Sequence, residues 1–468
     1  MATKVLLVGS GGREAAIAES VTTSPSTILY VISDKLNPSI AKLCGSKGNY
    51  RIGAKGATSS PQVVADYAVE KRIDIAVIGP EDPLVSGVAD ALARNKIPCV
   101  GPVKACAMIE GDKSYCRDLM RKHNILYYPE YRSFTSPVEA FSYIEEMNKK
   151  GIPLAIKPSG LTGGKGVKLT GEQLTDSDET KEYVESILKD KPGGLQSVVI
   201  EEKILYPLEV TIQTFTDGKS VVPAPCVQDY KRAYEDNEGP NTGGMGSYSQ
   251  SDQLMPFFSR REYEETAQMV LNITSALAKE TGERYHGFLY AQMMKGISPA
   301  KRRPTTILTE ANVRLGDSEA INILPILEND DPIEIYWSMV DETLSAKKLR
   351  FANRATVCKY LVPEGYPENP KENQRVEVDQ EGMRNTGARY YWASVNMSDE
   401  GILTTKSRAL AVLGISESLE EAESIAEGAT RYVKGALRHR SDIGRNTQEM
   451  IKKVQSKWKT YPKLEDRP

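Results

Sequence analysis

The sequence predicts an α/β protein of about three domains, and two patterns carry that prediction. In the first hundred residues, short apolar runs alternate with segments whose apolar residues recur at helical spacing. Glycine-rich or charged loops follow two of those runs, GSGGRE at 9–14 and GPEDPL at 79–84. Parallel strands joined by helices place such loops at one edge of the sheet, where ligands bind, so we expect a doubly wound parallel sheet.

The elements of this first domain, residues 1–103, follow from the same periodicities. Pro61 after two serines marks a helix start, and the run KVLLV near the N-terminus is typical of a buried strand. The predicted strands are 4–8, 27–32, 74–79 and 97–101, and the predicted helices are 13–21, 61–72 and about 85–95.

A second module is expected over residues 104–331. It opens with a charged helix and contains a Gly/Pro/Asn-rich stretch, 236–248, which we expect to be a loop without regular structure. Its predicted helices are 104–123, 260–281 and about 318–328, and its clearest strands lie within 149–169 and at 197–204, 287–294 and 305–312.

A third module is expected over 332–445, followed by a polar, basic tail at 446–468. The pattern Ser418-x-x-Glu421 is a capping box and predicts a helix start. The strands of this module are expected at 355–361, 389–395 and 408–413.

Composition argues against several classes of function. The 468 residues include 60 basic and 63 acidic side chains, interspersed to a formal net charge of -3, which is unlike a nucleic-acid or anionic-membrane binder. No apolar run could span a bilayer, and the first residues lack a secretory cleavage pattern, so a cytoplasmic protein is expected. Three scattered histidines argue against a histidine-ligated zinc, and the six cysteines lack paired spacing, so free thiols are expected.

The segment GLTGGKGVKL, 160–169, is a candidate phosphate-binding loop. Its glycines leave backbone N–H groups able to approach an anion, Lys165 supplies charge, and Lys157 ends the preceding strand. It is not a Walker A loop, and GSGGRE is not a dinucleotide fingerprint because Glu14 takes the third glycine position. The alternative to phosphate binding is that both glycine-rich segments are ordinary turns. For GSGGRE the sequence favours neither interpretation clearly.

The segment TEANVRLGD, 309–317, is a candidate cation site. In a strand, Glu310, Asn312 and Arg314 would share one face, with Gln292 on the neighbouring strand. Few oxygen ligands together with substrate phosphates suit Mg²⁺, and the arginine suits an anion. The alternative is a solvated polar strand face.

The glycine-dense stretch GPNTGGMG, 239–246, follows QDYKR, which places Asp229, Lys231 and Arg232 close together. Glycine-dense loops of this length in compact domains are usually functional or disordered. A flap over a reaction centre and a plain surface hairpin are both open interpretations.

Taken in order, these motifs resemble those of the ATP-grasp ligases and, within them, the glycinamide ribonucleotide synthetase (phosphoribosylamine–glycine ligase) family. The resemblance runs from the N-terminus to about residue 445. It is carried by VLLVGSGGRE, VIGPEDPLVSGVAD, GPVKACAMIEGDKSYCRDLM, IKPSGLTGGKGV, VIEEKI, QDYKR, GPNTGGMGSYS, GFLYAQMM, TEANVRLGDSE and HRSDIG.

The resemblance implies a fold and an activity. The fold would be a pre-ATP-grasp domain, an ATP-grasp domain of two α+β subdomains, with nucleotide binding at about 124–203, and a small C-terminal α/β domain. The activity would be ligation of glycine to 5-phosphoribosylamine through glycyl phosphate, with ATP and Mg²⁺ (or Mn²⁺), in purine biosynthesis. The partners would be these small molecules, with no nucleic acid or membrane, and the protein would be a monomer or homodimer. GPNTGGMG would be the lid that protects the acyl phosphate from water.

The resemblance also implies roles for individual residues. For ATP these are Lys113, Lys157, Gly163, Gly164, Lys165, Gly166, Glu201, Glu202, Lys203, Ile204, Glu209, Lys231 and Asn241. For the other substrates they are Gly11, Gly12, Arg13, Glu14, Asp229, Asn241, Thr242, Gly243, Gly244, Arg314, Gly316 and Asp317. Arg314, Lys231 and Asp229 would act in catalysis, and Glu310, Asn312 and Gln292 would hold the metal.

The chain departs from the family pattern at three positions. Ala15 stands where His usually follows GGRE, and Ser318 and Ile321 replace the Pro and Gln of RFGDPExQ. The segment before Glu209 is also about one residue longer. Two alternatives therefore remain open: an ATP-grasp ligase with a different amine acceptor, and a non-catalytic nucleotide-binding paralogue.

Overall fold

The computed structural model describes residues 2–163, 166–329, 331–399 and 401–461. The chain divides into two compact units. The first unit comprises Met1–Ala107, Thr211–Tyr290 and Asn312–Asn446, and the second comprises Met108–Val210, Ala291–Ala311 and Thr447–Pro468. No helix in the described ranges is long and apolar enough to cross a membrane.

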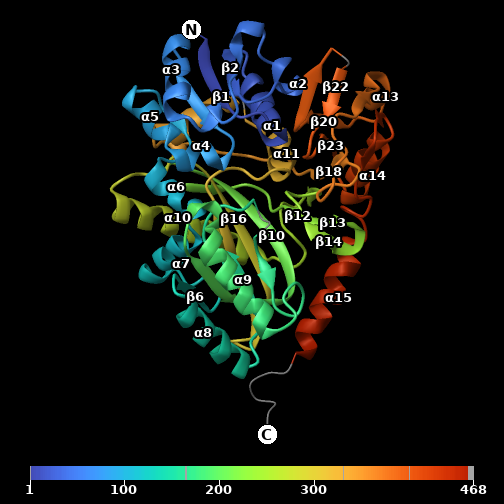
Figure 1. The fold of residues 1–468 in the computed structure, drawn as a ribbon. Coiled ribbons are helices and arrows are strands. Elements are labelled where there is room, and N and C mark those ends of the chain that lie inside the picture. Colours follow the sequence, from blue (N-terminus) through green and yellow to red (C-terminus); the bar gives the residue numbers. More distant parts are fainter. Residues whose placement is uncertain (1, 164–165, 330, 400, 462–468) are drawn as a thin grey trace. The chain divides into compact units, whose positions relative to one another are not determined.

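The first unit opens with the predicted parallel sheet, in the order β3–β2–β1–β4–β5 (Figure 1). Strand β1 is wholly buried from Val5 to Val8, as a strand inside a parallel sheet should be. The predicted helix at 85–95 is wrong in its start, because Gly87, at φ +89°, separates two short helices. The elements are β1 Thr3–Val8, α1 Gly12–Thr22, β2 Thr27–Ser33, α2 Pro38–Ala41, β3 Tyr50–Ile52, α3 Pro61–Lys71, β4 Ile75–Ile78, α4 Glu81–Ser86, α5 Val88–Arg94 and β5 Cys99–Val100.

The C-terminal part of the first unit is built on an antiparallel sheet in the order β12–β15–β18–β23–β20. Helix α14 packs on β18 and β23, and Ser418 caps its N-terminus through the amide of Glu421. The elements are β18 Ala355–Pro363, β19 Arg375–Val378, α13 Gln380–Asn385, β20 Arg389–Trp392, β21 Val395–Ser398, β22 Gly401–Thr404, β23 Leu410–Ser416, α14 Leu419–Thr430, β24 Val433–Lys434 and β25 Leu437–Arg438.

The stretch 236–248 is not the irregular loop that its composition predicts. Strands β13 (Arg232–Tyr234) and β14 (Glu238–Asn241) form a two-stranded hairpin, and β15 (Gly246–Ser249) enters the sheet between β12 (Gln228–Asp229) and β18. The register shifts between Arg232 and Tyr234, so this short hairpin is paired irregularly. Tertiary pairing therefore overrides the turn-like composition here.

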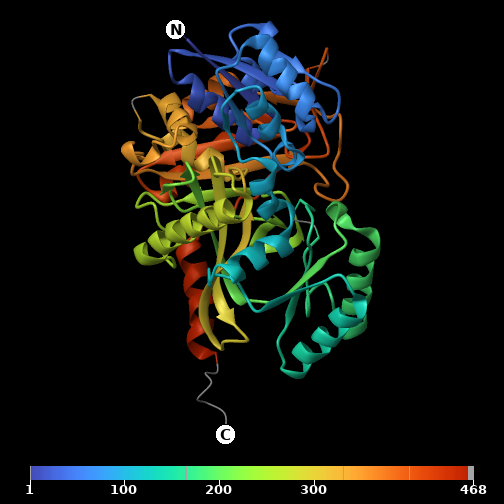
Figure 2. The same cartoon turned by 90° about the vertical axis from the view of Figure 1, so that its left-hand side faces the viewer.

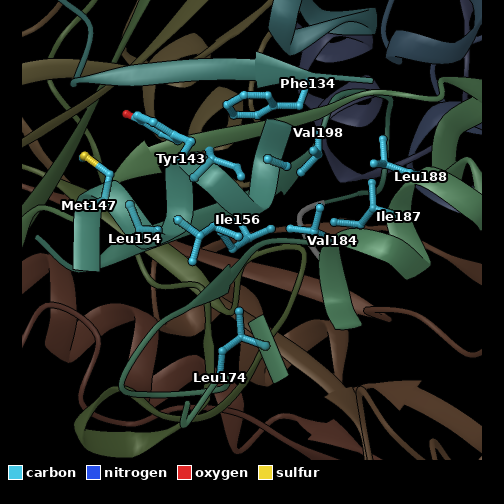
Figure 3. Packing of buried hydrophobic residues seen from close by; sticks show 13 residues of the cluster. Phe134, Tyr143, Met147, Leu154, Ile156, Leu174, Val184, Ile187, Leu188 and Val198 are labelled. Atoms are coloured by element: carbon cyan, nitrogen blue, oxygen red, sulfur yellow. The ribbon is translucent and has the colours of Figure 1, made fainter. Parts of the chain in front are cut away.

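The second unit contains an antiparallel sheet, β6–β9–β7–β8, covered by two helices that lie side by side (Figure 2). Apolar residues of the helices and of the sheet form one core, which includes Tyr143, Ile156 and Val184 (Figure 3). The predicted helix at 104–123 is instead two helices, because Asp112 caps a new one by accepting the amide of Tyr115. The elements are α6 Lys104–Gly111, α7 Lys113–Lys122, β6 Tyr131–Phe134, α8 Pro137–Lys149, β7 Leu154–Pro158, β8 Lys168–Leu169, α9 Ser177–Asp190 and β9 Val198–Glu202.

A further sheet, in the order β11–β10–β16–β17, contributes residues to both units. The helix predicted over 318–328 is a single α-helical turn and a half, continued by a 3₁₀ turn that contains Pro325. The remaining elements are β10 Leu205–Thr216, β11 Val221–Pro223, α10 Arg260–Thr281, β16 Gly287–Ser298, β17 Arg303–Asn312, α11 Glu319–Ile323, α12 Pro332–Val340 and α15 Thr447–Thr460.

Candidate active site

In the second unit, Glu201 is the centre of a buried ion cluster. Its two carboxylate oxygens bind Arg117 Nε at 2.7 Å and Lys157 Nζ at 2.6 Å. Arg117 also donates to the carbonyl of Thr309 at 2.9 Å, which ties α7 and β9 to β17. Burial alone would raise the pKa of Glu201, but Arg117 and Lys157 lower it to about 2. The cluster is therefore charged, and Glu201 orients Lys157 at the end of β7.

The start of the glycine-rich loop is tied to the start of α7. The backbone N–H of Lys113 donates to the carbonyl of Ser159 at 3.0 Å, and its Nζ donates to the carbonyl of Gly160 at 3.2 Å. Gly163 has φ +58°, and a Cβ on Gly166 would lie 2.9 Å from Pro158, so both positions favour glycine. Gly164 and Lys165 lie outside the described residues.

The segment from β9 to β10 holds the residues expected to recognise adenosine. Glu202 accepts the hydroxyl of Ser298 at 2.7 Å and the amides of Glu130 and Ala300, so its carboxylate organises the surrounding backbone. Lys203 is held by Glu172 at 2.8 Å, and Ile204 is buried. Glu209, on β10, accepts a hydrogen bond from Gln292 Nε2 at 2.8 Å.

The proposed metal ligands lie on two adjacent strands. Glu310 and Asn312 are two residues apart near the end of β17, and Thr309 donates to the carbonyl of Gln292 on β16 at 3.0 Å. The expectation that Arg314 continues this strand face is wrong, because β17 ends at Asn312. Among the described residues, no three His, Cys, Asp or Glu side chains are grouped to hold a metal. One carboxylate with amide oxygens still fits Mg²⁺, which takes few protein ligands and completes its shell with phosphates and water.

In the first unit, Arg314 joins a group of charges at the glycine turn after β1. Its Nε lies 3.1 Å from Glu81 Oε2, while Arg13 contacts the same oxygen at 3.9 Å and Glu14 Oε1 at 2.5 Å. Arg13 also donates to the carbonyl of Leu315 at 3.0 Å. Burial would raise the pKa of Glu81, but Arg314 and Arg13 lower it to about 2. The Gly11 amide donates to Glu14, which thereby caps α1.

A second group in this unit surrounds Asp317. Arg408 pairs with its carboxylate at 3.2 Å, and the hydroxyl of Tyr360 donates to the same carboxylate. Arg408 Nη1 also donates to the carbonyls of Gly243 and Gly244 at 2.6 and 3.1 Å. Gly244 has φ +105°, and a Cβ there would meet Asp229 Oδ1 at 3.0 Å.

The remaining predicted residues lie on or beside the same hairpin. The backbone N–H and the hydroxyl of Thr242 both donate to the carbonyl of Lys231 at 2.8 Å, and Asn241 pairs with Arg232 across β13 and β14. Gly316 donates its amide to Gln213 Oε1 at 2.7 Å. Asp229, Lys231, the glycine turn and Asp317 therefore belong to one region of the first unit.

Comparison with known proteins matches three family models to most of the chain: the N domain of phosphoribosylglycinamide synthetase at 3–110, its ATP-grasp (A) domain at 111–320 and its C domain at 356–446. The chain belongs to the phosphoribosylglycinamide synthetase family. It is 46% identical to a phosphoribosylamine–glycine ligase of Methanopyrus kandleri over 95% of this chain and 96% of that one. A Pyrococcus furiosus protein of the same name is 44% identical over 96% of both chains. The crystal structure of phosphoribosylamine–glycine ligase from Thermotoga maritima has a TM-score of 0.72 at 25% identity, covering 94% of this chain and 100% of that one. The resemblance and the fold class are thus confirmed.

The three positions at which residues differ from the synthetase family pattern, Ala15, Ser318 and Ile321, are all buried. Ser318 lies 2.6 Å from the hydroxyl of Ser247, which also donates to Asn322, and both Ser318 and Ile321 are fully buried. Ala15 lies within α1, which packs against α11. A Cβ on Gly12 would meet Ile321 at 3.3 Å. These three residues therefore belong to the buried packing around the Gly11–Gly12 turn.

The motif pattern missed four side chains that the structure places among the predicted ones. Arg117 and Glu81 stand inside recognisable motifs, and their charge beside a glycine loop was the available signal. Arg408 is the first residue of one predicted strand and Tyr360 lies within another, and no local pattern marks either of them.

Proposed function

We propose that this synthetase-family chain ligates glycine to 5-phosphoribosylamine, with conversion of ATP to ADP and phosphate, in purine biosynthesis. The observation that carries the proposal is near-full-length identity, above 40%, to relatives named phosphoribosylamine–glycine ligase. The glycine carboxylate would attack the γ-phosphorus of ATP and release ADP. The amine nitrogen of phosphoribosylamine would then attack the glycyl carbonyl and release phosphate.

In the nucleotide half, formed by residues of the second unit, positioning and charge neutralisation are the main tasks of phosphoryl transfer. We assign Lys157, oriented by Glu201, and Lys113 with Lys165 to the phosphates. Gly163, Gly164 and Gly166 allow the backbone to approach them. The chain from Glu201 to Ile204 would recognise adenine, chiefly through backbone groups because both glutamates are engaged in the protein, and Glu209 would take the ribose hydroxyls.

Glu310, Asn312 and Gln292 would hold Mg²⁺ or Mn²⁺. When bound, the ion would neutralise phosphate charge and favour in-line transfer. The hydrogen bond from Gln292 Nε2 to Glu209 turns the amide nitrogen toward the ribose-binding residue. The carbonyl oxygen of Gln292 is therefore its group suited to a cation.

In the amine half, formed by residues of the first unit, we assign the glycine turn with Arg13 and Glu14, together with Gly316 and Asp317, to phosphoribosylamine. Arg314 would stabilise charge on the acyl phosphate. Asp229 and Lys231, with Asn241 to Gly244, would border the reacting groups, and Lys231 and Asn241 would also reach the nucleotide. All the proposed partners are small molecules, and we propose that the protein is cytoplasmic and a monomer or homodimer.

The decisive test is ADP release by the purified protein with ATP, Mg²⁺ and glycine, with and without phosphoribosylamine generated in the assay. ADP release that requires both co-substrates supports the proposal. Lys157→Met should abolish that release, while Lys189→Met, at an exposed position of α9, should not. Release with another amine alone, or tight ATP binding without any release, would contradict the proposal in favour of a different ligase or a non-catalytic paralogue.

A further inference from the structure

Arg408 contacts three separate parts of the first unit, the Gly243–Gly244 turn, Asp317 and Tyr360. Its Nη1 donates to the carbonyls of Gly243, Gly244 and Asp317 at 2.6, 3.1 and 2.7 Å. Its Nη2 lies 3.2 Å from Asp317 Oδ2, and its guanidinium stacks 4.4 Å from the centre of the Tyr360 ring. One side chain therefore joins the turn after β14 to the segment after β17, from a position just before β23.

Tyr360 completes the arrangement from the opposite side of Asp317. Its hydroxyl donates to Asp317, and a Cβ on Gly12 would approach that hydroxyl to 2.2 Å. Because only glycine tolerates this approach, the turn at the start of α1 is packed against the same group. Asp317 is thus fixed between Arg408 and a tyrosine that touches the Gly11–Gly12 turn.

The hairpin of β13 and β14, which leads into the Gly243–Gly244 turn, is also anchored by residues 438–441. Arg438 and Arg440 donate to the carbonyls of Ala233 and Arg232 at 2.8 and 3.0 Å, and Ser441 donates to Glu235. Contacts from 438–441 thus hold β13 and the turn at its end, and Arg408 holds the Gly243–Gly244 turn that follows β14.

We propose that Arg408 is a positioning residue for the amine half: it holds Gly243 and Gly244 against Asp317, so that the acyl phosphate and the amine are presented to each other in reacting geometry. This inference rests on the proposed function. It assigns to the C-terminal part of the chain a role in the attack of the amine on the acyl phosphate, through contact with the Gly243–Gly244 turn.

The contacts argue for positioning over direct binding. The Arg408 side chain is 13% exposed, and its Nη1 and Nη2 groups are engaged by protein oxygens. Burial would lower its pKa, but Asp317 and Tyr360 raise it, so the guanidinium stays charged. The planar fork matters because it serves several acceptors at once, which an ammonium cannot reproduce.

The test compares Arg408→Met and Arg408→Lys with Arg375→Met, which removes an exposed arginine of the same C-terminal part. For Arg408→Met we expect kcat/KM for phosphoribosylamine to fall about 10²-fold, the effect of displacing reacting groups by an ångström, while KM for ATP stays within about twofold. ADP should be released in excess of glycinamide ribonucleotide, since the acyl phosphate would hydrolyse. Arg408→Lys should be intermediate, and Arg375→Met should match the unaltered protein.

A second measurement separates this inference from the proposed function. Hydrogen exchange of the 242–245 amides should quicken in Arg408→Met without ligands, while that of β1 is unchanged. If the unaltered protein makes no glycinamide ribonucleotide, the proposed function fails. The exchange data alone then test whether Arg408 holds the Gly243–Gly244 turn in place. Equal losses for all substrates with one ADP per product, unchanged exchange, or unfolding of both variants would each overturn the inference.

Discussion

The two halves of the proposed site are held by the same kind of arginine–carboxylate contact, but the contacting residues are farther apart in sequence in the amine half. In each, an arginine with little exposure to water holds a carboxylate and backbone carbonyls: Arg117 with Glu201 and Thr309, and Arg408 with Asp317 and the Gly243–Gly244 turn. Arg117 and Glu201 are 84 residues apart, whereas Arg314 and Glu81 are 233 apart and Arg13 and Leu315 are 302 apart. The nucleotide half is thus assembled largely within one module, and the amine half from distant segments of the chain.

The Glu201 and Glu81 ion pairs also differ in how far they are removed from water. Glu201 and its partner Arg117 have side chains only 3% and 4% exposed, while Glu81 and Arg314 are 29% and 17% exposed. A buried pair costs far more to break than one that water can reach. We therefore expect a mutation in the Arg117–Glu201 pair to affect stability first, and a mutation in the Arg314–Glu81 pair to affect turnover first.

The largest effect should come from Glu310→Gln, which tests whether the two halves share one metal-dependent reaction. Turnover should fall roughly 10³-fold, because a charge-stabilising ligand is lost where phosphate charge develops. ATP affinity without metal should be unchanged by calorimetry. Glu264→Gln, at an exposed position of α10, is the matched control. Undiminished ADP release in Glu310→Gln would refute the metal assignment.

The comparison itself is tested by replacing one arginine in each half. Arg117→Met leaves Glu201 buried with Lys157 alone, so the free energy of unfolding should fall by about 3–5 kcal/mol. Arg314→Met removes one of the two arginine partners of a partly exposed carboxylate, so stability should fall by only about 1 kcal/mol while turnover falls strongly. Urea unfolding and ADP release measured on the same preparations check both. Equal loss of stability in the two variants would remove the distinction.

The features that could be predicted from the sequence are those specified by short segments, and the features that were missed depend on residues far apart in the chain. The parallel sheet, β7 with Lys157, and β17 with Glu310 and Asn312 follow from local apolar runs and motifs, because those signals are contained in short segments. A hairpin at 232–241 was only one of two open interpretations, because the composition of its strands favours a loop and their anchoring comes from distant residues, 438–441. Arg408 was not predictable, because its role depends on a turn 165 residues earlier. The place of Arg314 beyond β17 was missed because where a strand ends is set by its neighbours.

Acid should act more strongly on the nucleotide half. The pKa of Glu201 is lowered to about 2, so its contribution is complete above the unfolded value of about 4.3 and is lost as pH falls toward 2. Over that window the unaltered protein should lose about 3 kcal/mol of unfolding free energy that Glu201→Gln does not lose. Glu81→Gln should change the pH slope less, since solvent screens its more exposed carboxylate. Urea unfolding at pH 5, 4, 3 and 2 gives the slopes, and parallel slopes for Glu201→Gln and the unaltered protein would contradict the prediction.

The smallest expected effect concerns a long-range contact that the nucleotide half does have. Trp458 of α15 donates its indole N–H to the carbonyl of Tyr206 at 2.9 Å, and Lys457 lies 4.9 Å from the centre of the Tyr206 ring. Tyr206 has φ +51°, a conformation that costs a non-glycine residue about 1 kcal/mol or more, and it lies between Ile204 and Glu209. If the indole holds this turn in place, Trp458→Phe should raise KM for ATP about fivefold, the equivalent of one hydrogen bond, and leave kcat unchanged. Lys453→Gln, exposed on the same helix, should change neither constant. An unchanged KM in Trp458→Phe would mean that β10 fixes Tyr206 unaided, and the nucleotide half would then be as self-contained as its motifs suggest.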